Sequence, residues 1–198
     1  MARRYDHSRE EIQQLTLEKV SEILKTESVH SLSLRKIAKV VGYTPATLIN
    51  IFGNYSGLLL AVNAESLDEL HELSITALAS EANALKKLHA LANVYLSYAC
   101  EHTHRWQLIF DHRMPEGEEV PHWHQQRIDL MFSLLDGCLQ IIAPEKSSSE
   151  RETATRVLWA GVHGICLLAT EDKLFSKAHA SGEMLIQSLI DNYLNSWC

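Results

Sequence analysis

The stretch that decides the fold is SLRKIAKVVGYTPATLINIFGNYSGLL, which occupies residues 33–59. Gly42 separates two short segments with helical periodicity, and Ser33 and Thr44 stand where each helix needs an N-cap. Pro45 follows at the first helical position, where its missing backbone N–H costs nothing. Two short helices joined by a tight turn are the geometry of a helix-turn-helix, and the stretch therefore predicts one.

The second helix of this pair suits the major groove of DNA because it presents small and hydroxyl side chains. Thr hydrogen-bonds base edges or touches a thymine methyl group, and Asn pairs with adenine. The alternative is a capped surface helix in an ordinary bundle. Arg3 and Arg4 form either a minor-groove arm or a solvated terminus. With these two arginines, the candidate DNA contacts are Ser33, Arg35, Tyr43, Thr44, Pro45, Ala46, Thr47, Asn50 and Tyr55.

Helical periodicity extends outward along the whole chain. Leu outnumbers Val by 29 to 9, and Pro and Gly together number only 12 (4 + 8), which favours helices over strands and turns. We expect an all-α fold of about nine helices. The first helix is predicted to begin at a capping box formed by Ser8 and Glu11. The others are predicted over residues 33–41, 45–52, 55–79, 83–100, 105–112, 122–142, 148–170 and 182–197.

The stretch around the helix-turn-helix resembles the DNA-binding domain of TetR/AcrR-type transcriptional regulators. Residues 8–60 carry that family's pattern in Ser33, Ile37-Ala38, Gly42, Thr44-Pro45, Thr47-Leu48, Phe52 and Leu58-Leu59. Residues 158–164, LWAGVHG, resemble the Trp-His-Gly signature of one C-terminal subfamily. The resemblance implies a homodimeric regulator with a helix-turn-helix domain over residues 1–53. It also implies a helical ligand-binding and dimerisation domain over residues 54–198.

Two positions depart from the family pattern. Ile49 stands where the family usually has Tyr, and Tyr55 stands where it usually has Lys. Both usual residues contact phosphates, so the ionic part of the DNA affinity is expected to be smaller here. This keeps open a second hypothesis, a helical small-molecule-binding protein with a degenerate DNA-reading head.

The charge is distributed unevenly along the chain. The net charge of −7 combines +2 over residues 1–60 (8 Lys/Arg against 6 Asp/Glu) with −9 over the remainder (10 against 19). The asymmetry indicates two parts with different partners.

Aromatic side chains gather on the predicted helices of the second half, where the resemblance implies a small-molecule pocket. Such pockets are mostly apolar with a few polar anchors. The alternative is that these residues are packed core. We expect an apolar or aromatic effector, and the candidate contacts are Tyr95, Tyr98, Trp106, Phe110, Trp123, Met131, Trp159 and His163. Dimerisation is expected through the last two helices, whose apolar faces are wide.

Several other functions are not indicated. The four cysteines lie far apart without a CxxC, and we interpret the histidines between residues 102 and 124 as surface residues and not as metal ligands. No phosphate loop, dinucleotide fingerprint or nucleophile elbow occurs, so we expect no enzyme and no cofactor. The longest apolar stretch, residues 157–170, is shorter than the about 20 residues of a membrane span, and the arginine-containing start lacks an apolar run. We therefore expect a cytoplasmic protein with no membrane partner.

Overall fold

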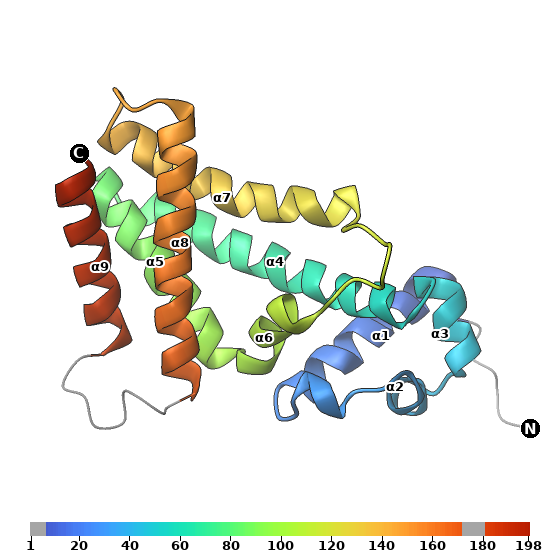
Figure 1. Ribbon diagram of the computed structural model, residues 1–198. Coiled ribbons are helices and arrows are strands. Elements are labelled where there is room, and N and C mark those ends of the chain that lie inside the picture. Colours follow the sequence, from blue (N-terminus) through green and yellow to red (C-terminus); the bar gives the residue numbers. More distant parts are fainter. Residues whose placement is uncertain (1–6, 172–180) are drawn as a thin grey trace, which may run out of the picture. The chain divides into compact units, whose positions relative to one another are not determined.

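The computed structural model describes residues 7–171 and 181–198 of the chain. Within these residues the regular structure is nine α helices and one short 3₁₀ helix, without strands (Figure 1). The all-α prediction is confirmed. The chain divides into two compact units. Of the described residues, unit 1 comprises 7–66 and 104–120, and unit 2 comprises 67–103, 121–171 and 181–198.

Unit 1 is built around the helix-turn-helix. Its elements are α1 (Arg9–Leu24), η1 (Val29–Ser31), α2 (Leu34–Val41), α3 (Pro45–Phe52), the first part of α4 (Tyr55–Ser80) and nearly all of α6 (Thr103–Asp111).

Local side-chain chemistry fixes where these helices begin. Ser8 and Glu11 form the predicted capping box of α1, and Ser33 Oγ accepts a hydrogen bond from the Lys36 backbone N–H at 3.2 Å. The turn between α2 and α3 passes through Gly42, whose φ of 85° favours glycine. Thr44 Oγ1 accepts from the Thr47 N–H at 3.1 Å, so α3 begins as the sequence predicted.

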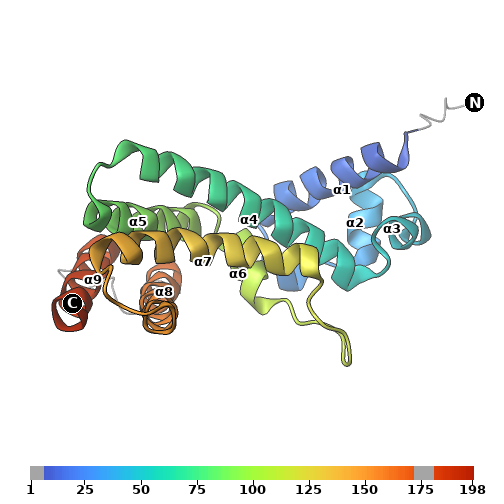
Figure 2. The ribbon, with the colours of Figure 1, turned by 90° about the horizontal axis from the view of Figure 1, so that it is seen from above.

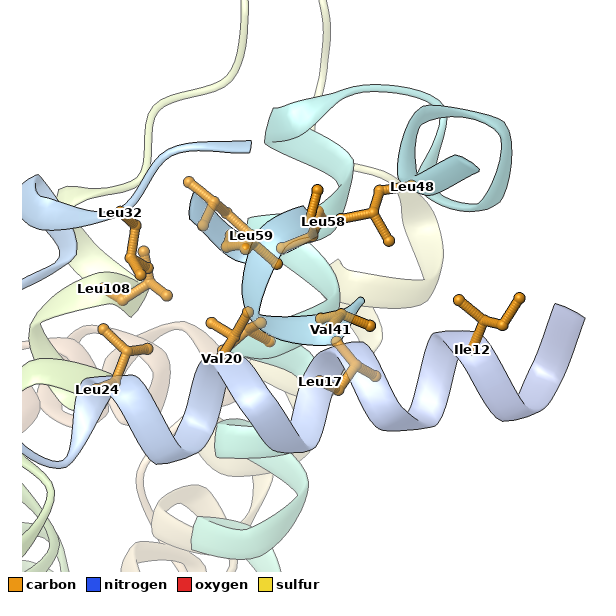
Figure 3. Close-up of a cluster of buried hydrophobic side chains, with 13 residues drawn as sticks. Ile12, Leu17, Val20, Leu24, Leu32, Val41, Leu48, Leu58, Leu59 and Leu108 are labelled. Atoms are coloured by element: carbon orange, nitrogen blue, oxygen red, sulfur yellow. The ribbon is translucent and has the colours of Figure 1, made fainter. Parts of the chain in front are cut away.

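The core of unit 1 is a cluster of aliphatic side chains from all of these helices (Figure 3). Ile37, Leu48 and Leu58 are completely buried in it. Leu108 on α6 is also completely buried in the cluster, although α6 is distant in sequence from the other contributors. The predicted division at residues 53 and 54 therefore lies inside this unit. It marks the start of α4, while the packed unit extends to residue 66 and includes residues 104–120.

The junction of α3 and α4 is unusually close. Asn54 Oδ1 accepts from the Gly57 N–H at 2.7 Å and caps α4. A Cβ placed on Gly57 would stand 2.3 Å from the backbone oxygen of Phe52. Only glycine permits this approach without a backbone shift, and the position of α3 against α4 depends on it.

Unit 2 is a helical bundle. It contains the second part of α4, α5 (Ala84–Glu101), α7 (His122–Ile142), α8 (Ser148–Glu171) and α9 (Gly182–Trp197). Helices α5, α7 and α8 pack against one another, and α9 packs on α5 and α8. Figures 1 and 2 show α8 and α9 side by side and antiparallel. Gly161 lies at this contact, and a Cβ there would stand 2.6 Å from Leu189 Cδ2 at the end of a flexible side chain.

The burial of individual side chains differs from the sequence prediction in a few places. Helical spacing predicts Leu85 on the same face of α5 as Leu88 and Ala92, but its side chain is 39% exposed, and Leu91 and Leu96 are buried. His124 was expected at the surface and is only 4% exposed. Histidine is amphipathic, so sequence alone does not decide on which face of α7 it lies.

Among the residues described, no single helix has the length and apolar composition to cross a membrane. One pair, α3 with α4, passes on length and composition alone and is bent by 64° at the break.

Candidate DNA-reading surface and effector-binding cluster

The outward face of α3 carries the short polar side chains that the sequence singled out. Thr44, Ala46 and Asn50 are exposed, and Thr47 is half-buried. The hydroxyl oxygens of Thr44 and Thr47 lie 2.9 Å apart, which places two hydroxyl groups side by side at the start of the helix. Leu48, the buried residue of α3, anchors the opposite face in the core of unit 1. The helix therefore presents one small polar face to solvent.

The two tyrosines predicted as DNA contacts have a second role. Tyr43 and Tyr55 are half-buried and pack against the core of unit 1. Burial raises the pKa of the Tyr55 hydroxyl, which therefore stays protonated and able to donate a hydrogen bond. Ile49, which replaces the family's usual tyrosine, is also half-buried.

The cations of unit 1 are not equally available to phosphates. Lys36 forms an ion pair with Glu27. Ser33, Arg35, Lys39 and Pro45 are exposed. Arg3 and Arg4 lie outside the described residues. Among the described residues, the exposed cations near the helix-turn-helix are consequently few, in agreement with the charge of only +2 over residues 1–60.

In unit 2 the structure brings three of the predicted effector contacts together. The Tyr95 hydroxyl lies 2.9 Å from His163 Nδ1, and the His163 ring stacks on Trp159 with centroids 5.1 Å apart. Phe132 on α7 meets Trp159 edge-on at 5.6 Å. We call Tyr95, Phe132, Trp159 and His163 the aromatic cluster. It joins α5, α7 and α8, and burial lowers the pKa of His163, favouring the neutral imidazole.

The remaining predicted effector contacts lie elsewhere. Trp106 and Phe110 belong to α6 in unit 1, where their rings meet edge-on at 5.3 Å and Trp106 is completely buried. Tyr98 donates to Glu69 Oε2 at 3.3 Å. Trp123, at the start of α7, lies under the Arg127 guanidinium, and Met131 is half-buried on the same helix. Within unit 2 the structure thus brings three of the eight residues together, and within unit 1 it brings two others together.

Sequence reasoning missed several interacting residues. Phe132 was not predicted, although it stands on the same helix as Trp123 and Met131. The Asn63 side-chain amide donates to the Leu108 carbonyl at 3.3 Å, and Ser56 Oγ lies 2.7 Å from His112 Nε2. These contacts tie the end of α6 to the first part of α4 within unit 1. They join residues more than 40 positions apart, for which local periodicity carries no signal.

The candidate metal ligands do not converge in the described part of the chain. No group of three or more His, Cys, Asp or Glu side chains is placed to hold a metal ion there. Cys138 and Cys166 are buried thiols, and burial raises the pKa of Cys166 to about 12, which keeps it protonated.

An all-helical chain with a capped helix-turn-helix in one unit and a helical bundle in the other defines a class of DNA-binding regulators. Residues 88–193 match the family described as "Tetracyclin repressor-like, C-terminal domain". The chain belongs to the tetracycline-repressor-like (TetR) family of transcriptional regulators. No curated protein matches it in sequence.

Solved structures support the same fold. A protein of unknown function from Rhodococcus sp. RHA1 is 21% identical, with 98% of each chain covered and a TM-score of 0.77. A TetR-family transcriptional regulator from Streptomyces coelicolor is 15% identical over 95% of this chain and 100% of that chain, with a TM-score of 0.69. The transcriptional regulator FadR from Bacillus subtilis, in complex with stearoyl-CoA, is 15% identical over 93% and 96%, with a TM-score of 0.68.

Proposed function

We propose that this protein is a ligand-responsive repressor. In this proposal α3 reads a near-palindromic operator, and an apolar or aromatic small molecule bound by unit 2 releases the DNA. The observation that carries the proposal is the outward face of α3, where Thr44, Thr47 and Asn50 stand on a helix anchored by Leu48. Binding an operator would place the protein in the cytoplasm with the DNA.

The reading surface fits direct contact with base edges. Short side chains let the α3 backbone approach the groove floor, where Thr and Asn each discriminate bases. The helix has no acidic residue in its first turn, so its free N–H groups face no repulsive carboxylate when a phosphate approaches. Each good base contact contributes about 1–3 kcal/mol of discrimination.

Selection of bound sequences from a randomised duplex pool tests the DNA-reading function. The full-length protein should recover a palindrome, and its half-sites should stand about 34–36 Å apart or a multiple of that distance. Thr47→Ala and Asn50→Ala should each weaken binding to the selected operator by about tenfold. Gln14→Ala is the matched control, because Gln14 is an exposed polar residue on α1. Unchanged operator affinity in both α3 variants would show that the reading surface is elsewhere.

The aromatic cluster is the proposed effector-binding site. Three aromatic rings and a neutral imidazole form an apolar cluster with one polar pair, the composition usual for small-molecule sites. FadR of Bacillus subtilis holds stearoyl-CoA, so long-chain acyl compounds belong with aromatic compounds in a first screen. Ligand-dependent increases in melting temperature would identify binders.

Release of DNA by the effector is proposed as a population shift. The effector would favour a dimer whose two α3 helices no longer match the operator spacing. A coupling free energy of about 1–3 kcal/mol would produce a 5- to 150-fold change in DNA affinity.

Dimerisation is proposed through α8 and α9. These helices leave Val157, Leu167, Leu168 and Met184 exposed, with Met184 at 59%. Large exposed apolar side chains in one region mark interaction surfaces. Replacing Leu168 and Met184 by Glu should give a folded monomer in analytical ultracentrifugation, and a persistent dimer would place the interface elsewhere.

The alternative is a small-molecule-binding protein with a degenerate reading head. Tyr55, which stands where the family usually has Lys, and Lys36, which is paired with Glu27, favour it, because both positions leave fewer cations to meet phosphates. A folded dimer that recovers no sequence from the duplex pool but binds a small molecule would establish this alternative.

A further inference from the structure

The carboxy-terminal end of α3 lacks a cation of its own. The last carbonyl groups of a helix have no partners within it, and the helix dipole favours a positive charge beside them. The sequence of α3, PATLINIF, contains no charged residue. Arg9 on α1 supplies the missing group, because its Nη2 donates to the backbone oxygen of Ile51 at 3.1 Å. The end of α3 is thus capped by a guanidinium from another helix.

The other end of α3 is tied to the same part of α1. Tyr43 immediately precedes Thr44, the N-cap of α3. The Tyr43 hydroxyl lies 2.7 Å from His7 Nδ1, and the two rings are in tilted contact with centroids 6.2 Å apart. His7 and Arg9 are two residues apart in sequence, yet they hold opposite ends of α3.

The start of α1 is held by its own hydrogen bonds, so the backbone that carries His7 and Arg9 is fixed in place. The Ser8 N–H donates to Glu11 Oε2 at 2.7 Å, and the Glu11 N–H donates to Ser8 Oγ at 3.2 Å. This capping box sets the backbone between His7 and Arg9. One turn further along, Ile12 is buried in the core of unit 1, which anchors α1 against α2 and α3.

We propose that His7 and Arg9 form a clamp that positions α3 for reading DNA. The inference rests on the proposed DNA-reading function. It assigns His7 and Arg9 the task of holding α3 in position and not of contacting DNA. The clamp restricts rotation and sliding of α3, so that Thr44, Thr47 and Asn50 meet base edges in one register. Arg9 acts through the Ile51 carbonyl, and it therefore contributes to sequence specificity more than to ionic attraction.

Salt-dependent DNA binding separates a positioning arginine from a phosphate contact. Arg9→Gln in the full-length protein removes the charge and shortens the reach to Ile51, while Arg9→Lys keeps the charge. Lys25→Gln is the matched control, because it removes one exposed positive charge from the other end of α1. Affinities for the selected operator and for an unrelated duplex are measured over a series of salt concentrations.

The clamp predicts that Arg9→Gln reduces the affinity for the operator more than the affinity for the unrelated duplex. Arg9→Gln should weaken operator binding about tenfold relative to Lys25→Gln. Its affinity for the unrelated duplex, and the slope of its binding affinity against salt concentration, should be the same as those of Lys25→Gln. Arg9→Lys should restore part of the operator affinity. An equal loss on both duplexes, with a salt slope smaller by about 0.9, would make Arg9 a phosphate contact and overturn the proposal.

Amide hydrogen exchange tests the clamp without DNA, so its failure can be told from failure of the DNA-reading function. Arg9→Gln should speed exchange of the amides from Ile49 to Gly53 severalfold and leave those of α2 unchanged. His7→Phe keeps a ring beside Tyr43 and removes the hydrogen bond, and it should speed exchange at the start of α3. Unchanged exchange throughout α3 in both variants would refute the clamp, whatever sequence the wild-type protein selects.

Discussion

The hydroxyl of Tyr95 lies 2.9 Å from Nδ1 of His163, joining α5 to α8 within unit 2. The pair is half-buried, and Trp159 stacks on the imidazole. Because burial disfavours the imidazolium, His163 enters this contact as a neutral group with one donor and one acceptor nitrogen. A polar pair beside aromatic rings can orient an apolar ligand by one hydrogen bond.

Truncating the aromatic cluster should reduce the response to effector. Trp159→Ala and His163→Ala should raise the effector concentration needed to release DNA by about tenfold, since each removes a contact worth about 1–2 kcal/mol. DNA binding without effector should be retained, as measured by fluorescence anisotropy. Tyr95→Phe deletes only the hydroxyl and reports on the hydrogen bond alone. If both alanine variants instead lose helicity to the same degree, the residues are core and not ligand contacts.

Two half-buried histidines, His112 and His163, make the free energy of unfolding depend on pH. Burial lowers the pKa of His112, an effect that its hydrogen bond with Ser56 partly offsets, and burial lowers the pKa of His163. Because these pKa values are lower in the folded state, the unfolded chain binds more protons than the folded state as the pH falls below about 6.5. The free energy of unfolding therefore decreases with falling pH. The loss should stop below the folded-state pKa values, while stability should stay level above about pH 7.

Thermal unfolding between pH 7.5 and 5 measures this dependence. Each histidine should contribute less than the about 1.4 kcal/mol per pH unit of a full proton difference, because solvent screens half-exposed groups. His112→Gln and His163→Gln should each flatten the curve. Stability that rises as the pH falls over this range would contradict the assignment.

The junction of α3 and α4 should not tolerate a side chain at Gly57. A Cβ there would collide with the Phe52 backbone oxygen at 2.3 Å, so Gly57→Ala should destabilise unit 1 by about 1–3 kcal/mol. Gly137→Ala on α7 is the matched control, because nothing lies within 4 Å of its Cβ. That control should gain up to about 1 kcal/mol from helix propensity. Equal melting temperatures for the two variants would show that the junction relaxes freely.

Much of the fold could be predicted from the sequence because its signals are local. A capping residue, a proline at the first helical position and a glycine with positive φ act within one turn of chain, and the bounds of α3 follow from them. Burial depends on partners that are distant in sequence. Helical spacing in α1 predicts a buried stripe of Ile12, Leu15, Val20, Ile23 and Leu24. Leu15 and Ile23 are half-buried, however, and Leu17, outside that stripe, is buried. The aromatic cluster was predicted in part, since Phe132 depends on how α7 packs against α8.

Gly161 on α8 lies against the end of the Leu189 side chain on α9. A Cβ there would stand 2.6 Å from the end of Leu189, whereas a Cβ at Gly164 would meet nothing within 4 Å. Gly164→Ala should therefore raise the stability by up to about 1 kcal/mol, through helix propensity. Gly161→Ala gains the same propensity but displaces Leu189, so it should be about 1–2 kcal/mol less stable than Gly164→Ala. Calorimetry of both variants gives the difference, and a zero difference would mean that Leu189 moves aside without cost.

The completely buried side chain of Leu108 makes α6 part of the core of unit 1. Leu108→Ala should cost roughly 2–5 kcal/mol, from lost apolar burial and the cavity left behind. Leu130→Ala, at a residue that is 50% exposed on α7, should change the stability by no more than about 0.5 kcal/mol.

Amide hydrogen exchange identifies the helices that Leu108→Ala destabilises. Val20 and Leu24 share the cluster with Leu108, so amides of α1 should lose protection even though α1 precedes α6 by about 80 residues. Protection in α8 and α9 should change less, because these helices have their own core in unit 2. Loss of protection confined to α6 would show that Leu108 fills space without supporting the helix-turn-helix, and the core of unit 1 would then end at α4.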